Sequence, residues 1–129
     1  EMTSTVDPAC DVLIVDDDVD VAEAVSDTLR DAGHRVIVAN GGDDALRLLN
    51  GGFAVPKVIL LDLMMPGMNG WEFMAEQKKV PALAAIPVVI VSARTSSEPL
   101  EAAAYLRKPL KIADLLRVVA RFAPPPAQP

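Results

Sequence analysis

The sequence predicts an α/β protein with a single parallel β-sheet that carries helices on both faces. Three observations support this fold class. Apolar runs typical of strands alternate with segments whose apolar residues recur at helical spacing. Hydrophobic residues make up 51% of the chain and aromatic residues only 4%, which predicts the aliphatic core of a sheet covered on both faces. Four of the five apolar runs end on a carboxylate, hydroxyl or ammonium side chain.

Length and charge narrow the classes of protein further. At 129 residues the chain has the size of one domain. Its net charge is −6 and it has no basic stripe, so we expect no direct nucleic-acid binding. The only cysteine, Cys10, cannot form an internal disulfide, which suits a reducing cytosol. No apolar run reaches the ~20 residues of a membrane span. We therefore expect a cytoplasmic protein without membrane contact.

The expected domain organisation has three parts. Residues 1–9 form a flexible N-terminal arm, residues 10–122 form the folded domain, and residues 123–129 form a proline-rich tail.

The first half of the chain predicts two strands and two helices. Residues 11–16 have strand character, and residues 19–32 keep helical spacing until Gly33 can end the helix. A second strand at 35–39 leads through a glycine-rich turn into a helix that ends at Gly51. His34, in the turn before this strand, is interpreted as a polar loop residue.

The second half predicts three strands, at 57–62, 87–92 and 104–107. Helices are expected at 71–79, where Pro81 marks the end, and at 111–122. Only a short helix, at 98–103, fits between the last two strands. This alternation implies right-handed crossovers between parallel strands.

Reactive side chains gather where these strands end. Asp16 and Asp17 follow the first strand, Asp62 ends the third, Ser92 the fourth, and Lys108 follows the fifth. Carboxyl ends of parallel strands meet at one edge of the sheet, so these groups are expected in one crevice. Three carboxylates within ~5 Å would repel pairwise by about 3 kcal/mol at an effective dielectric near 20. Such a cluster requires a cation, and its hard oxygen ligands favour Mg²⁺ or Mn²⁺.

The most specific segment is Asp62-Leu63-Met64-Met65-Pro66-Gly67-Met68-Asn69-Gly70. It resembles the phosphoacceptor motif of response-regulator receiver domains, and Val15-Asp16-Asp17-Asp18 resembles their acidic pair. The runs 86–93 and 105–109 resemble their fourth and fifth strands, so the resemblance covers about residues 10–122. It implies a flavodoxin-like, doubly wound sheet with strand order 2-1-3-4-5.

The resemblance implies a phosphorylation-dependent signalling switch rather than an enzyme. Asp62 would accept a phosphoryl group, in a reaction that the domain itself catalyses, from a sensor histidine kinase or a phosphotransfer protein. Asp17, Asp62 and the backbone carbonyl of Met64 would bind Mg²⁺ or Mn²⁺, with Asp16 acting largely through water. Ser92 and Lys108 would bind phosphoryl oxygens, and a downstream protein partner would respond.

Three further expectations come from the resemblance. Ser92 and Tyr105 would form the conformational switch. Lys108-Pro109 would be a cis peptide. Met64 and Arg94 border the approach of a hydrolytic water, so their bulk and charge predict a long-lived phosphoaspartate.

One departure from the family pattern concerns the region between Ser92 and Lys108, which has fifteen residues and is shorter than usual. The missing length falls on the fourth helix of the family pattern, part of a face through which many members dimerise. We therefore expect a monomer.

Two alternative functions use the same residues differently. A haloacid-dehalogenase-like phosphohydrolase would use Asp16 and Asp18 as nucleophile and acid/base, but it leaves Asp62 unexplained. A flavin-binding module of the same topology would need a glycine- or hydroxyl-rich phosphate loop after the first strand, where this chain has an acidic cluster.

Overall fold

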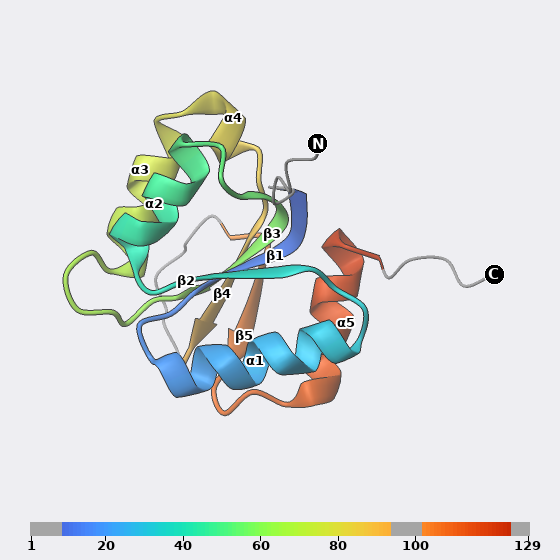
Figure 1. Ribbon diagram of the computed structural model, residues 1–129. Helices are drawn as coiled ribbons and strands as arrows, with labels where there is room; N and C mark the ends of the chain where they lie inside the picture. Colours follow the sequence, from blue (N-terminus) through green and yellow to red (C-terminus); the bar gives the residue numbers. More distant parts are fainter. Residues whose placement is uncertain (1–8, 94–101, 125–129) are drawn as a thin grey trace, which may run out of the picture.

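The computed structural model describes residues 9–93 and 102–124. The elements follow in the order β1 (Ala9–Val15), α1 (Val19–Asp31), β2 (Val36–Ala39), α2 (Gly42–Asn50), β3 (Val55–Asp62), α3 (Gly70–Lys78), α4 (Pro81–Ala84), β4 (Val88–Ser92), β5 (Ala104–Arg107) and α5 (Ile112–Phe122). Figure 1 shows the strands side by side at the centre and the helices around them.

The sheet confirms the predicted fold class. Its strand order is β2-β1-β3-β4-β5, and every pairing is parallel. β1 and β3 form its centre, with Val12 opposite Val58 and Val15 opposite Leu61. The order reverses at β1, because β2 lies on one side of it and all later strands on the other. Parallel sheets of this kind bind ligands beyond the carboxyl ends of the strands near such a reversal.

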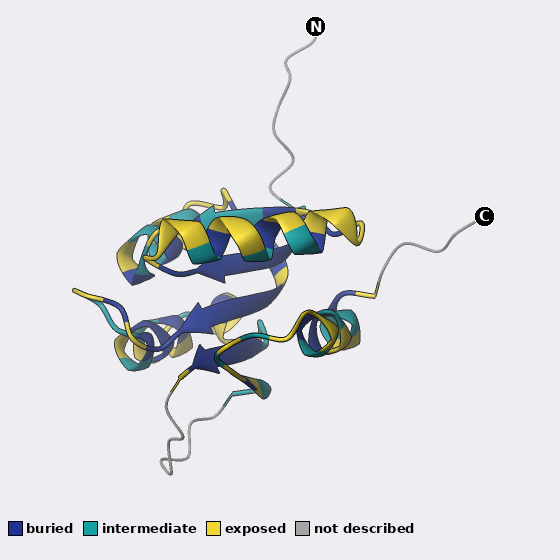
Figure 2. Cartoon of the chain, turned by 90° about the horizontal axis from the view of Figure 1, so that it is seen from below, coloured by how far each residue is buried: buried dark blue, intermediate teal, exposed yellow. Residues whose placement is uncertain are grey.

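Helices cover both faces of the sheet. The apolar side chains of α1 and α5 pack on one face, where Leu29 and Val119 are fully buried. Those of α2, α3 and α4 pack on the other, around Ala45 and Phe73. In Figure 2 the strands are buried while the outer sides of the helices are exposed. This burial on both faces explains the continuous aliphatic runs that predicted the strands.

The sheet extends slightly beyond the expected strand boundaries. β1 begins at Ala9, which pairs with Val55, so the last residue assigned to the arm belongs to the sheet. β3 likewise begins before Pro56 rather than after it. At the other end, Ala123 is fully buried although it was assigned to the tail.

A one-turn helix, α4, was not predicted. Pro81 stands at its first turn, where a missing N–H is tolerated. The buried side chain of Gln77 donates hydrogen bonds to the carbonyls of Leu83 (2.7 Å) and Ile86 (3.1 Å). These tertiary bonds hold the connection from α3 to β4 and leave no local signal in the sequence.

Two other sequence expectations concern the helix at 98–103 and the environment of His34. The helix expected at 98–103 does not include Ala102 or Ala103, and the N–H of Ala103 donates instead to the Val88 carbonyl at 2.8 Å. Residues 94–101 lie outside the described residues. His34 lies in the connection between α1 and β2, as expected, but the connection folds it inward until only 5% of it is exposed.

No helix among residues 9–93 and 102–124 is long and apolar enough to cross a membrane.

Candidate phosphoacceptor site

Strand register brings the predicted site residues to one edge of the sheet. Val15, the last residue of β1, lies opposite Leu61, so Asp16 and Asp62 leave neighbouring strands at the same level. Asp62 in turn pairs with Val91, one residue before Ser92. Ser92 pairs with Arg107, and Lys108 follows directly. The site is therefore a consequence of parallel pairing that brings the carboxyl ends of these strands to the same level.

Asp16, Asp17 and Asp62 converge as expected. Each offers a carboxylate oxygen, and these three oxygens lie within 4.8 Å of one another. Asp16 and Asp62 are buried, whereas Asp17 is exposed. A set of carboxylate oxygens that is open to solvent on one side fits a hard divalent cation that keeps part of its water shell. The residues present therefore fit the magnesium that the fold family implies.

Backbone hydrogen bonds orient the two buried carboxylates. Oδ1 of Asp16 accepts a bond from the Asp18 N–H at 2.9 Å. Oδ1 of Asp62 accepts one from the Met64 N–H at 3.1 Å. In both residues Oδ2 is the oxygen that faces the ammonium of Lys108.

Lys108 bridges the two carboxylates. Its Nζ lies 3.6 Å from Oδ2 of Asp62 and 3.9 Å from Oδ2 of Asp16. Its backbone N–H donates to the Ser92 carbonyl at 3.0 Å, which ties β5 to β4 at the site. The Lys108-Pro109 peptide is cis, as the resemblance implied.

The electrostatics of the site are unfavourable in the absence of a cation. The pKa of Asp16 is raised to about 6, chiefly by burial and also by the neighbouring Asp62 carboxylate, although the Asp18 amide and Lys108 act to lower it. The charged form of Asp16 is thus disfavoured by its surroundings. A divalent cation would supply the charge that Lys108 alone does not.

The other predicted residues lie around this centre. Ser92 is buried at the end of β4, and the side chain of Met64 is exposed beside Asp62. Tyr105 lies on the edge strand opposite Ile90 and is 55% exposed. Arg94 lies outside the described residues.

Asp18 caps a helix in this structure. Its carboxylate accepts a hydrogen bond from the Val21 N–H at 3.2 Å and so begins α1. The group of carboxylates with the geometry to hold a metal ion comprises Asp16, Asp17 and Asp62 instead. This arrangement gives Asp62 a place in the site. It does not favour the phosphohydrolase, which would use Asp18 as its acid/base.

Two features of the surroundings were not anticipated from the sequence. Asp11, early in β1, is a buried carboxylate that pairs with Arg35 and Lys57. An apolar groove of about 390 Å³ opens between α1 and the start of α5, with Lys108 at its wall. Val21, Val25 and Ile112 are among the apolar residues that line the groove. The spacing of Val21 and Val25, four residues apart on α1, is the sequence feature that could have indicated it.

Residues 12–120, which make up nearly the whole described fold, match the response regulator receiver domain family. The chain belongs to this family, and it is therefore a receiver domain of two-component signalling. An uncharacterized 14.6 kDa protein of Leptolyngbya boryana is 32% identical over 87% of this chain and 88% of its own length. The DNA-binding response regulator MtrA of Mycobacterium tuberculosis is 36% identical over 86% of this chain. The match spans only half of that regulator's length.

Solved structures agree with the family. The chemotaxis protein CheY4 of Vibrio cholerae superimposes with a TM-score of 0.80 at 32% identity, covering 88% of this chain and 98% of CheY4. The receiver domain of Francisella response regulator 1452 gives a TM-score of 0.78 at 30% identity. The match covers 90% of this chain and 96% of that receiver domain.

Proposed function

We propose that Asp62 accepts a phosphoryl group from a phosphohistidine of a sensor kinase or a phosphotransfer protein. The observation that carries this assignment is the shared ion pair of Lys108 with Asp62 and Asp16 at the carboxyl end of the sheet. A buried carboxylate with an ammonium beside it has both a nucleophilic oxygen and a group that binds the incoming phosphoryl oxygens.

The transfer is a direct displacement at phosphorus. An oxygen of Asp62 attacks as the P–N bond of the donor breaks, and the electron pair of that bond leaves with the imidazole. Lys108 and the hydroxyl of Ser92 bind two of the equatorial oxygens, where negative charge concentrates. The domain's own residues thus catalyse the transfer to itself.

We further propose that Mg²⁺ or Mn²⁺ is the cofactor. Asp17, Asp62 and the Met64 carbonyl would hold it directly, and Asp16 would hold it through water. When bound, the metal neutralises charge on the phosphoryl group.

The donor has to approach the exposed side of the carboxylates. Val19 at the start of α1, Met64 after β3 and Ile112 at the start of α5 are large apolar side chains that are more than half exposed on this edge. The groove beside Lys108 adds an apolar wall. We infer that the phosphoryl donor docks here, and that the reaction takes place in the cytoplasm.

Ser92 and Tyr105 are proposed to transmit the phosphorylated state. β4 and β5 pair directly, with Ile90 opposite Tyr105, so a movement of Ser92 toward the phosphoryl group alters the end of the strand beside Tyr105. The downstream partner would then bind the β5 side of the domain by a population shift. We propose that the phosphorylated domain, taken as residues 10–122, remains monomeric, which light scattering with a stable phosphoryl mimic would test.

Slow hydrolysis is proposed as a further property. Met64 cannot orient a water by hydrogen bonding, and Arg94 can bind phosphoryl oxygens as a bidentate donor. Met64→Asn and Arg94→Glu are expected to speed phosphoryl loss. Val55→Asn is the matched control, because Val55 is as exposed as Met64 and lies at the start of β3, away from the site.

The assignment of Asp62 is tested with a small acyl-phosphate donor and intact mass measurement. The wild-type chain should gain one phosphoryl group only when Mg²⁺ or Mn²⁺ is present, and Asp62→Asn should gain none. Asp18→Asn is the control, since asparagine retains the helix cap. Equal labelling of Asp62→Asn and the wild-type chain contradicts the assignment.

A further inference from the structure

Every asparagine of the chain precedes a glycine, in the pairs Asn40-Gly41, Asn50-Gly51 and Asn69-Gly70. Such a pair is chemically labile. The backbone nitrogen of the glycine can attack the amide carbon of the asparagine side chain, because glycine has no side chain to obstruct the approach. All three pairs share this feature, so any difference in reactivity between them has to come from the fold.

The pair Asn69-Gly70 is protected by hydrogen bonds on both reacting groups. The side-chain Oδ1 of Asn69 accepts a bond from the Glu72 N–H at 2.9 Å and so caps α3. The Gly70 N–H, whose nitrogen would have to attack, donates to the Leu63 carbonyl at 3.0 Å. Gly70 is also buried. The two groups therefore cannot react without breaking the start of α3.

The pair Asn50-Gly51 is protected at its nitrogen. Asn50 is the last residue of α2, and the Gly51 N–H donates to the Arg47 carbonyl at 3.0 Å. The ring of Phe53 lies against Gly51, since a Cβ there would be 2.6 Å from a ring carbon. The side chain of Asn50 is exposed, but the nitrogen that would attack it is held in the last turn of the helix.

The pair Asn40-Gly41 has neither kind of protection. It connects β2 to α2, as can be followed in Figure 1, and Asn40 is exposed. Within residues 9–93 and 102–124, neither the Asn40 side chain nor the Gly41 N–H has a hydrogen-bond partner. The backbone of Gly41 is extended, with a φ of 169°, and no atom lies within 4 Å of the position of a Cβ. Both reacting groups therefore have room to meet.

We propose that Asn40 is a site of spontaneous deamidation, which converts it to aspartate or isoaspartate. The Gly41 nitrogen loses its proton to hydroxide and attacks Cγ of Asn40 with its electron pair. The bond between Cγ and the side-chain nitrogen breaks, and that nitrogen leaves as ammonia with a proton supplied by water. Water then opens the cyclic succinimide at one of its two carbonyls, and the carbonyl attacked decides between the two products.

The modification changes the edge of the sheet that carries the acidic site. Ala39, which ends β2 directly before Asn40, accepts a hydrogen bond from the Asp16 N–H at 3.2 Å. A carboxylate at position 40 adds a negative charge at the edge where Asp16, Asp17 and Asp62 converge. Isoaspartate also lengthens the main chain between β2 and α2 by a methylene group. The reaction needs no phosphoryl donor, so the inference stands apart from the proposed function.

The test incubates the full chain at mildly alkaline pH, where the glycine nitrogen is deprotonated more often, and maps the products by mass spectrometry. Trypsin separates the three asparagines, because Arg47 and Lys57 lie between them. The peptide with Asn40 should change from the mass of the amide to that of the acid several-fold faster than the other two. Its isoaspartate form should accept a methyl group from S-adenosylmethionine in the presence of an isoaspartyl methyltransferase.

The same chain in denaturant is the first control, because without the fold all three pairs should convert at comparable rates. Gly41→Ala should slow the conversion of Asn40 several-fold, because a methyl group then stands beside the attacking nitrogen. Asn40→Gln should form no product at that position, since the attack would have to close a larger ring. Asn50→Gln is the matched control, which removes another exposed asparagine and should leave the conversion of Asn40 unchanged.

Three outcomes would overturn the inference. In the first, Asn50 or Asn69 converts as fast as Asn40 in the folded chain. In the second, Asn40 remains an amide in the folded chain while it converts in denaturant. In the third, Gly41→Ala converts at the wild-type rate.

Discussion

The Nζ of Lys108 lies 3.6 Å from Oδ2 of Asp62, at the carboxyl end of a sheet in which both residues leave parallel strands. The same nitrogen also faces Asp16. Three carboxylates and one ammonium leave the cluster with an excess of two negative charges, which matches one divalent cation. In the proposed function, Lys108 would therefore supplement the metal and bind the phosphoryl group once Asp62 carries it.

Lys108→Gln should separate phosphorylation from metal binding. The variant removes the ammonium that neutralises the phosphoryl oxygens, so the rate of phosphorylation by an acyl phosphate should fall about 10²-fold. Metal affinity should stay the same or increase, because a competing cation has left the carboxylates. Lys111→Gln, which changes an exposed lysine nearby, serves as the control. A variant that phosphorylates at the wild-type rate would contradict this role.

Asp17→Asn should remove most of the stabilisation by magnesium. A ligand that binds only the folded state at a hundred times its Kd stabilises the fold by about 2.7 kcal/mol. Removing one direct carboxylate should eliminate most of the resulting rise in Tm. Asp18→Asn should keep that rise, because asparagine retains the cap of α1 and Asp18 is not one of the three carboxylates that converge at the site. Equal Tm shifts in the two variants would show that Asp17 is not a ligand.

The site could be predicted from the sequence because it depends on strand ends. Apolar runs locate β1, β3, β4 and β5, and parallel pairing then brings Asp16, Asp62, Ser92 and Lys108 to one edge. No side-chain detail is needed for that step.

Features that depend on tertiary contacts could not be predicted in this way. α4 depends on hydrogen bonds from Gln77 to Leu83 and Ile86, which no local pattern reveals. His34 is a polar residue of the kind expected in a turn, yet it is buried. The turn folds back on α1, and the backbone N–H of His34 donates to the Leu29 carbonyl.

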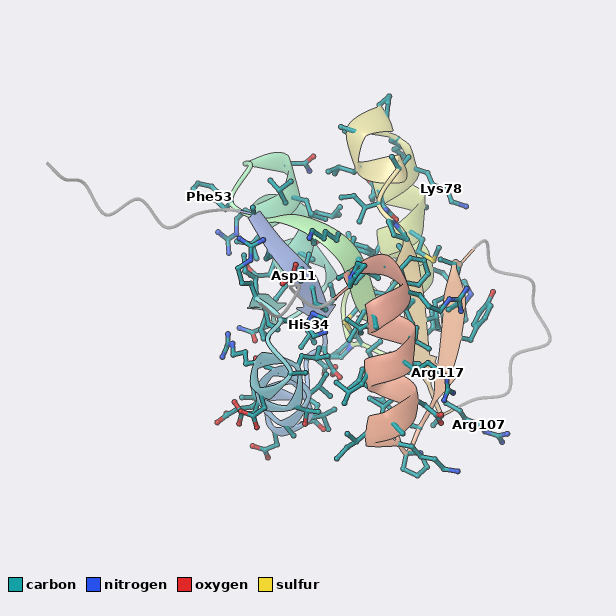
Figure 3. The ribbon with its side chains drawn as sticks, turned by 90° about the vertical axis from the view of Figure 1, so that its right-hand side faces the viewer. Asp11, His34, Phe53, Lys78, Arg107 and Arg117 are labelled. Atoms are coloured by element: carbon teal, nitrogen blue, oxygen red, sulfur yellow. The ribbon has the colours of Figure 1, made fainter. Side chains whose placement is uncertain are left out.

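Asp11 should give the fold a pH dependence that is independent of phosphorylation. Burial acts to raise its pKa, but the Arg35 amide (2.8 Å) and the Lys57 ammonium (3.4 Å) outweigh burial and hold the pKa below its usual range. A carboxylate with a depressed folded-state pKa stabilises the fold above about pH 4, and this contribution is lost as pH falls through the folded-state value. Figure 3 places Asp11 on β1.

The measurement is chemical denaturation of Asp11→Asn at two pH values. At about pH 7 the variant should lose about 1–2 kcal/mol of unfolding free energy, because the ion pairs disappear while the amide oxygen still accepts from Arg35. At about pH 3 the difference from wild type should be smaller. Asp27→Asn, at an exposed position on α1, should show neither effect. A difference that is independent of pH would contradict the ionised state of Asp11.

Gly42 should control the geometry of the loop that carries Met64. A Cβ at Gly42 would lie 2.9 Å from Cγ and Sδ of Met68 and 3.2 Å from its Cβ, so a rotamer change of Met68 alone cannot relieve the contact. Gly42→Ala must therefore displace the β3–α3 loop and, with it, the proposed metal-binding carbonyl of Met64. We expect about tenfold weaker magnesium binding, the size typical of changes that disturb ligand orientation.

The control for this substitution lies one residue earlier. Gly41→Ala adds the same methyl group where no atom lies within 4 Å, and the φ of 169° at Gly41 is extended backbone that alanine adopts. Its magnesium affinity should stay near the wild-type value even if the start of α2 becomes slightly less stable. Replacing Met68 by glycine in the Gly42→Ala background removes all three clashing atoms and should restore the affinity. The role of the Gly42–Met68 contact is refuted if Gly42→Ala binds magnesium normally, or if the second substitution restores nothing.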